Sequence, residues 1–296
     1  MVSDYTGRKE TAIRKHVPKS RSPGLVGRIL LEYHRLALAW QGFRHGRGRP
    51  VALRREADVI CVDDGALKIC IPDVALASRY RTGLGTSFGQ CADAYVGDTS
   101  YVPREGDVVV DIGAGIGEFA LWCADAGASV VAFEPDPNAY RCLKKNTTSL
   151  RHVRILPYAL WKERADLRLH STRDTLRSSL IDSGKGAARY ADVEAWSLDL
   201  LPAISALPVI DFMKIDGQGV EPEILAGGLR TLRRTRVIAI NLGAADRRKH
   251  LRERVMTILT SMEFRPIPHH REGTILVLNA SMVGPFSSRG NDRPGS

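Results

Sequence analysis

The sequence predicts an α/β protein whose main sheet is mostly parallel. From about residue 107 onward, short apolar runs of strand length alternate with helical segments, as in chains that cover a parallel sheet on both faces. One run passes through a glycine-rich turn into a helix, the connection that open α/β sheets use at their ligand-binding edge. The predicted strands are Val108–Ile112, Ser129–Glu134, Val153–Pro157, Phe212–Ile215, Val237–Asn241 and Thr274–Leu278.

Composition divides the 296-residue chain into four parts. Apolar side chains recur at helical spacing over Leu25–Trp40, which predicts an amphipathic helix. Asp63-Asp64-Gly65 stands between two apolar runs and indicates a hairpin. The expected parts are a basic N-terminal arm with that helix (1–50), an accessory lead-in segment with the hairpin (51–106), the main α/β domain (107–280) and a disordered tail (281–296).

The net charge of +10 is concentrated in the arm. Residues 1–55 hold 13 Lys and Arg against three Asp and Glu, whereas the rest of the chain holds 30 of each. A domain that grips nucleic acid is expected to carry its own basic face, because phosphate neutralisation dominates that affinity. Nucleic acid is therefore not the expected partner. The arm has two interpretations: its helix packs on the main domain, or it rests on an anionic membrane surface as a peripheral contact.

The five cysteines show no CxxC pair, and their odd number fits neither a disulfide framework nor a zinc site. No metal ligands are therefore assigned. No apolar run reaches the ~20 residues that a membrane-spanning helix needs, and the N-terminal residues lack the pattern of a cleaved signal. The expected location is the cytoplasm, with peripheral membrane contact as the extension that the arm suggests.

The most informative segment runs from Val108 to Ala120, an apolar strand followed by a glycine turn and a helix. Gly113, Gly115 and Gly117 would let backbone amides approach a ligand that side chains would otherwise block. A dinucleotide-binding turn reads GxGxxG, but Glu118 stands where its last glycine should fall. A carboxylate at the start of the helix disfavours a pyrophosphate there.

S-adenosylmethionine suits this turn better than a dinucleotide. It has no phosphate, and its cationic sulfonium and ammonium groups tolerate Asp111 and Glu118 nearby. Glu134 ends the next strand, 23 positions after Asp111, close to the ~20-residue separation at which an acid accepts hydrogen bonds from both ribose hydroxyls. The sequence therefore predicts S-adenosylmethionine as the cofactor, held by the segment from Asp111 to Asp136.

Three motifs together resemble the FkbM-type methyltransferases. They are Val109–Gly117, the Ala132–Pro137 run AFEPDP, and the Lys214–Glu221 run KIDGQGVE. The resemblance extends over about residues 95–242, half of the chain. It implies the Rossmann-like, mostly parallel sheet of a class I methyltransferase. It also implies O-methylation of a small-molecule or glycan acceptor, with a hydroxyl of a glycan, glycolipid or specialised metabolite receiving the methyl group.

The same resemblance implies roles for individual residues. Lys214 and Asp216 are the candidate catalytic residues, at the end of the fourth strand and facing the methyl acceptor. Ser178–Leu180 is similar to the family's serine-containing loop, which precedes a helix at Leu198–Leu200. The implied cofactor-binding residues are Asp111, Gly113, Ala114 and Gly115 around the methionine moiety, Glu134 at the ribose with Pro135 after it, Ala159 and Leu160 beside the adenine, and Asp216.

Two positions depart from the family pattern. Gln218 replaces a usual Glu, and Asn241 replaces an acid at the end of the next strand. Both amides can orient a hydroxyl but cannot take its proton at neutral pH. Asp216 is the carboxylate that remains, either as a general base or as a structural contact to the cofactor's amino group. Lys214 either serves the reaction or pairs with a nearby acid.

These departures leave a second hypothesis open, a catalytically degenerate protein that still binds S-adenosylmethionine. A third hypothesis is a nucleic-acid methyltransferase with the basic arm as its anchor. The third ranks below the others because residues 56–296 carry no net charge.

Overall fold

The computed structural model describes residues 51–56, 58–97, 101–171, 178–180, 189–243, 245–269, 271 and 273–282. The predicted arm, including its helix over Leu25–Trp40, lies outside the described residues, as does nearly all of the predicted tail. Within the described part of the chain, no helix is both long and apolar enough to cross a membrane.

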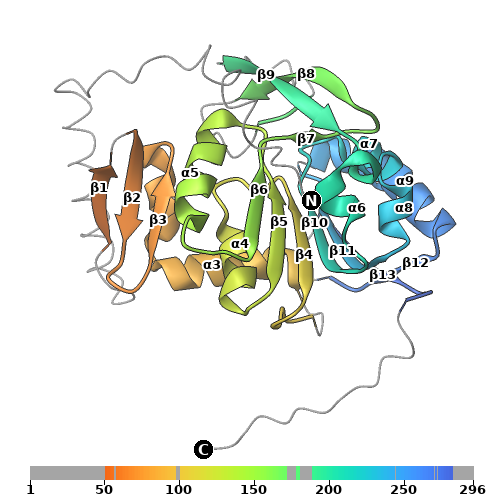
Figure 1. Cartoon of the computed structure of the whole chain (residues 1–296), viewed down its shortest axis with the longest axis horizontal. Coiled ribbons are helices and arrows are strands. Elements are labelled where there is room, and N and C mark those ends of the chain that lie inside the picture. Colours follow the sequence, from red (N-terminus) through yellow and green to blue (C-terminus); the bar gives the residue numbers. More distant parts are fainter. Residues whose placement is uncertain are drawn as a thin grey trace, which may run out of the picture.

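A seven-stranded sheet forms the centre of the molecule (Figure 1). In spatial order its strands are β12 (Phe264–Ile267), β13 (Thr274–Asn279), β11 (Thr235–Asn241), β10 (Ile210–Ile215), β4 (Val108–Ile112), β5 (Ser129–Phe133) and β6 (Val153–Leu156). The strands from β11 to β6 run parallel, whereas β13 and β12 are antiparallel additions. All six predicted strands are present, and the predicted fold class is confirmed.

Helices cover both faces of this sheet, and strand alternation supplies an apolar surface to each. On β10, Phe212 faces one helical layer and shares an apolar cluster with Phe119. The adjacent Met213 faces the other layer and shares a cluster with Val255. The first layer consists of α3 (Leu84–Val96), α4 (Glu118–Asp125) and α5 (Pro137–Thr147). The second consists of α6 (Pro202–Ser205), α7 (Glu221–Ala226), α8 (Leu229–Leu232) and α9 (Ala245–Ser261).

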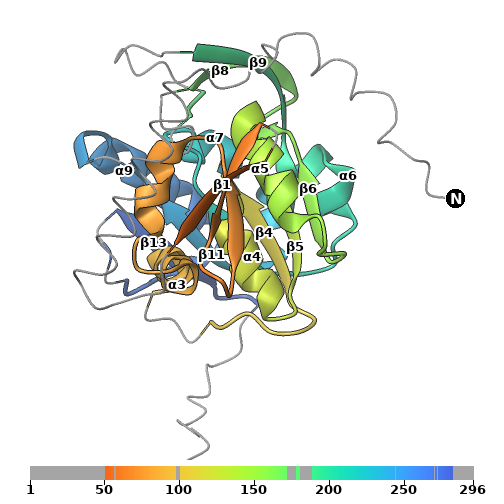
Figure 2. The ribbon, with the colours of Figure 1, turned by 90° about the vertical axis from the view of Figure 1, so that its left-hand side faces the viewer.

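An antiparallel meander precedes α3 and lies beside α5 in both overall views (Figures 1 and 2). It consists of β1 (Ala52–Glu56), β2 (Val59–Asp63) and β3 (Lys68–Ile71), and the 3-10 helix η1 (Val74–Tyr80) follows it. Asn146 of α5 pairs with both backbone groups of Cys70, at 2.7 and 3.0 Å, and donates to the Ile116 carbonyl at 2.8 Å. This amide therefore links the meander to the glycine turn.

The predicted hairpin is present around Asp63-Asp64-Gly65, whereas β1 and α3 are elements that no pattern in the sequence predicted. α3 packs its buried face, which includes Ala92 and Tyr95, into the core of the main sheet. It therefore contributes to the main fold, although it lies in the segment 51–106. The division of the chain at residue 106 stays a prediction.

A second small sheet lies above the carboxyl edge of the main sheet (Figure 1). Its order is β7 (Ala159–Leu160), β9 (Arg189–Trp196) and β8 (Ala165–Ser171). Leu169 of β8 and Val193 of β9 are buried in its own small apolar cluster. The carboxyl ends of the parallel strands, where open α/β sheets bind ligands, are therefore covered from above.

Candidate active site

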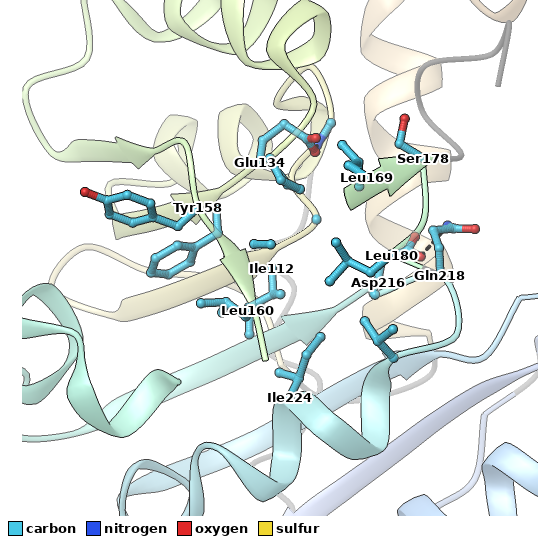
Figure 3. A pocket seen from close by; sticks show the side chains of 17 residues that line it. Ile112, Glu134, Tyr158, Leu160, Leu169, Ser178, Leu180, Asp216, Gln218 and Ile224 are labelled. Atoms are coloured by element: carbon cyan, nitrogen blue, oxygen red, sulfur yellow. Dashed lines mark hydrogen bonds between the residues drawn. The ribbon is translucent and has the colours of Figure 1, made fainter. Parts of the chain in front are cut away.

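A pocket opens at the carboxyl edge of β4, β5 and β10, beneath the small sheet (Figure 3). It encloses about 580 Å³, a volume that includes open solvent at its mouth. Its larger apolar side chains are Ile112, Phe133, Tyr158, Leu160, Leu169, Leu180, Val220 and Ile224, and its polar ones are Glu134, Ser178, Asp216 and Gln218. No Lys, Arg or His side chain lines it among the described residues.

The glycine turn after β4 forms the floor of this pocket. Gly113 has a φ of +73°, and a Cβ atom on it would lie 2.2 Å from the Asp216 carbonyl oxygen. Only glycine fits both requirements. The amides of Gly113 and Ala114 donate to the Phe133 carbonyl at 3.0 and 2.9 Å. The turn is therefore held tightly between the ends of β5 and β10.

Glu134 follows β5 directly and lies against the turn. Its Oε2 accepts a hydrogen bond from the Gly115 amide at 2.7 Å, and its Oε1 accepts one from the Asp136 amide at 2.8 Å. Burial raises the pKa of this carboxyl to about 8. When ionised, each oxygen keeps a further lone pair. The group can therefore accept hydrogen bonds from a ligand in the pocket while it holds the turn.

Asp136 connects the small sheet to this edge. One of its oxygens caps α5 by accepting from the Asn138 and Ala139 amides at 2.8 and 3.2 Å. The other accepts from the hydroxyls of Ser171 and Ser178 at 2.7 and 2.8 Å. Ser178, which lines the pocket, is thereby tied to the strand end that carries Glu134.

Asp216 follows β10 and lies on the side of the pocket opposite Tyr158 (Figure 3). Its Oδ1 accepts from Gln218 Nε2 at 2.6 Å, and its Oδ2 accepts from Tyr95 Oη at 2.8 Å and Asn241 Nδ2 at 3.1 Å. Both amides that depart from the family pattern therefore donate to this carboxylate. Tyr95 was not among the predicted site residues.

Lys214 does not face the pocket, in contrast to the expected position towards the acceptor. Its side chain is 4% exposed, and Nζ lies 2.7 Å from Asp111 Oδ1 and 2.9 Å from the Gly113 carbonyl oxygen. Burial acts to lower the pKa of Lys214, but the nearby carboxylates of Asp111 and Asp216 outweigh it and raise that pKa. The ammonium group is therefore charged and is used to hold the turn.

The predicted cofactor residues thus fall into two groups. Gly113, Gly115, Glu134, Pro135, Ala159, Leu160 and Asp216 line the pocket. Asp111 and Ala114 are buried and do not line the pocket, and Asp111 Oδ2 has no hydrogen-bond partner among the described residues. Within the same part of the chain, no group of His, Cys, Asp and Glu could hold a metal ion.

Glu118, the acid that interrupts the dinucleotide pattern, begins α4 and turns towards the accessory segment. It accepts from Arg79 Nη2 at 3.0 Å and from Tyr80 Oη at 2.9 Å. The carboxylate expected at the start of this helix is therefore present and bound by side chains from η1.

Residues 111–266 match the family model for the methyltransferase FkbM domain. None of the curated proteins compared with the chain matches it.

Solved structures with similar chains include three methyltransferase-fold proteins. Magnesium protoporphyrin IX methyltransferase from Synechocystis with bound S-adenosylmethionine is 12% identical, over 69% of this chain and 84% of that one, with a TM-score of 0.41. Fibrillarin from Aeropyrum pernix, with natively bound S-adenosyl-L-methionine, is 13% identical over 78% of this chain and 100% of that one, with a TM-score of 0.40. Precorrin-6y C5,15-methyltransferase from Geobacter metallireducens is 12% identical over 65% and 86%, with a TM-score of 0.37. None of these identities is high enough to transfer a substrate.

Proposed function

Because the chain belongs to the methyltransferase FkbM domain family, we propose that it binds S-adenosylmethionine in the pocket and methylates a hydroxyl group of a glycan, glycolipid or specialised metabolite. The match over residues 111–266 confirms the resemblance that the sequence motifs indicated. Methyl transfer follows from the family. The oxygen acceptor and its chemical class are the proposal.

The charge of the pocket is the observation that carries the choice of cofactor. Glu134 and Asp216 are its acidic side chains, and no basic side chain lines it among the described residues, although the chain has a net charge of +10. Among the described lining residues, the phosphates of a dinucleotide would find no cation. A ligand with a sulfonium and an ammonium group would instead meet the Asp216 carboxylate, and also that of Glu134 once this group ionises, which supports S-adenosylmethionine.

The positions of the lining residues agree with this ligand. Glu134 would accept hydrogen bonds from the ribose hydroxyls, and the Gly113–Gly115 backbone would lie beside the methionine moiety. The apolar side chains of Tyr158 and Leu160 provide a wall for the adenine ring. We assign Lys214 a positioning role, because its ammonium group contacts Asp111 and the turn.

When bound, the cofactor supplies a methyl group activated by its sulfonium. Holding the acceptor oxygen in line with that methyl group provides much of the acceleration. Asp216 lies in the same pocket and would either take the proton of the acceptor hydroxyl or face the cationic end of the cofactor. The donors on this carboxylate favour an organised active site over the degenerate alternative, because Gln218 and Asn241 orient Asp216.

The acceptor can be identified by incubating the purified full chain with methyl-labelled S-adenosylmethionine and fractionated extracts of glycans, glycolipids and small molecules. The expected product is a labelled species heavier by one methylene group and stable to mild base, as an ether is. The matched control is Glu134→Ala, which should not produce it. Labelling that persists with this variant, or that appears on nitrogen or carbon, would contradict the proposal.

A further inference from the structure

Tyr95 joins the site from α3, outside the family match over residues 111–266. Its side chain is buried, and its hydroxyl donates to Asp216 Oδ2 at 2.8 Å. The ring packs edge-on against Phe119, with 5.5 Å between the centroids, and lies 4.9 Å from Lys214 Nζ. The hydroxyl is thus fixed by a ring that is itself held on several sides.

Tyr95, Gln218 and Asn241 together form what we call the Asp216 clamp. They come from three separate elements, namely α3, the loop after β10 and the end of β11. Because donors contact both carboxylate oxygens, the clamp fixes the orientation of the whole group. Gln218 adopts a φ of +55°, and its carbonyl accepts from Ser179 Oγ at 2.9 Å, so this donor is held as well.

The clamp holds a negative charge next to the glycine turn. The backbone carbonyl of Asp216 lies against Gly113, and its side chain lines the pocket. The nearest buried cation, Lys214, contacts Asp111 and the turn and does not line the pocket. Asp216 therefore lies beside the turn, where a ligand over Gly113 would meet its negative charge.

We propose that Tyr95 is a positioning residue that holds the Asp216 carboxylate towards the sulfonium of bound S-adenosylmethionine, so that the site distinguishes the charged cofactor from its uncharged product. This inference rests on the proposed function. Methyl transfer converts the sulfonium of S-adenosylmethionine into the neutral thioether of S-adenosylhomocysteine. A fixed carboxylate nearby stabilises the first ligand and gives no such stabilisation to the second. The clamp thus favours cofactor binding and product release.

The test compares dissociation constants for S-adenosylmethionine and S-adenosylhomocysteine, by calorimetry on the full chain. Tyr95→Phe keeps the ring and removes the donor. The affinity ratio is the affinity for S-adenosylmethionine divided by the affinity for S-adenosylhomocysteine. Tyr95→Phe should lower this ratio about threefold, and Asp216→Asn should lower it about tenfold. In the Asp216→Asn background, Tyr95→Phe should have no further effect on the ratio, because it acts through that carboxylate.

The matched control is Tyr101→Phe, since Tyr101 stacks on Phe212 at 4.5 Å and does not line the pocket. Its affinity ratio should equal that of the wild type. If Tyr95→Phe unfolds, Asn241→Ala removes another donor of the clamp and should lower the ratio in the same direction.

Equal losses of affinity for both ligands in Tyr95→Phe, or an unchanged ratio, would overturn this inference and leave the proposed function intact. Failure of the wild-type chain to bind either ligand would overturn both.

Discussion

Replacing Lys214 by methionine tests whether its ammonium group has the positioning role that we assign. Asp111 is fully buried, and its Oδ1 is bound by Lys214 at 2.7 Å. Removing one partner of a buried ion pair leaves an uncompensated charge and typically costs about 3–5 kcal/mol. For a domain of this size each kcal/mol lowers Tm by about 2–4 °C, so the expected decrease is roughly 6–20 °C.

The assay is thermal unfolding followed by circular dichroism, with and without S-adenosylmethionine. The double variant Lys214→Met/Asp111→Leu should recover most of the lost stability, because an apolar pair of similar volume often replaces a buried ion pair without loss. Lys68→Met is the control, since Lys68 forms an exposed ion pair with Glu56, and it should change Tm little. If Lys214→Met kept the wild-type Tm but lost turnover, the positioning role would be wrong and Lys214 would act directly in the reaction.

Three further predictions address the turn, the ribose acceptor and the arm. Gly113→Ala places a Cβ 2.2 Å from the Asp216 carbonyl oxygen at a φ of +73°. It should lower the free energy of unfolding by about 1–3 kcal/mol, measured by heat or urea, and weaken the binding of S-adenosylmethionine in calorimetry. Wild-type affinity would show that the turn tolerates a side chain at this position. Burial raises the pKa of Glu134 to about 8, so its contribution to the stability of the ligand-free protein is present at low pH and is lost as the pH rises through about 8. The affinity for S-adenosylmethionine should increase over the same window as the carboxylate forms, and Glu134→Gln should abolish that pH dependence; parallel pH profiles for the two proteins would argue against a ribose contact. For the arm, the full chain should sediment with anionic vesicles at low salt and be released by added salt. A chain without residues 1–50 should not sediment with them. Equal binding by the truncated chain would exclude a membrane role of the arm.

The parts of the fold that the sequence predicted are those with a strong local pattern. The strands of the parallel sheet are continuous apolar runs, because both faces are buried. α3 was not anticipated, since Gly85 and Gly89 interrupt its pattern and the helix is recognisable only from the sheet on which it packs. β8 and β9 were missed because they carry polar residues on one face and pair across a long intervening segment.

The site residues that the sequence predicted correctly are likewise those that lie close together along the chain. Asp111, the glycine turn and Glu134 lie within one strand-turn-helix-strand unit, so their spacing along the chain reflects their spacing in space. Tyr95 lies 121 positions from Asp216, and no local pattern in the sequence joins them. The orientation of Lys214 depends on the register that pairs it with Asp111 across β10 and β4. From the sequence, Gln218 and Asn241 are recognisable only as the loss of two acidic side chains. Their role as hydrogen-bond donors to Asp216 depends on tertiary geometry.

Calorimetric titration of the full chain with S-adenosylmethionine, S-adenosylhomocysteine and NAD shows whether this pocket is a site for S-adenosylmethionine. The acidic pocket, without a basic lining residue in the described part of the chain, predicts that both sulfur ligands bind and that NAD does not. Tight binding of NAD, or binding of neither sulfur ligand, would contradict the account.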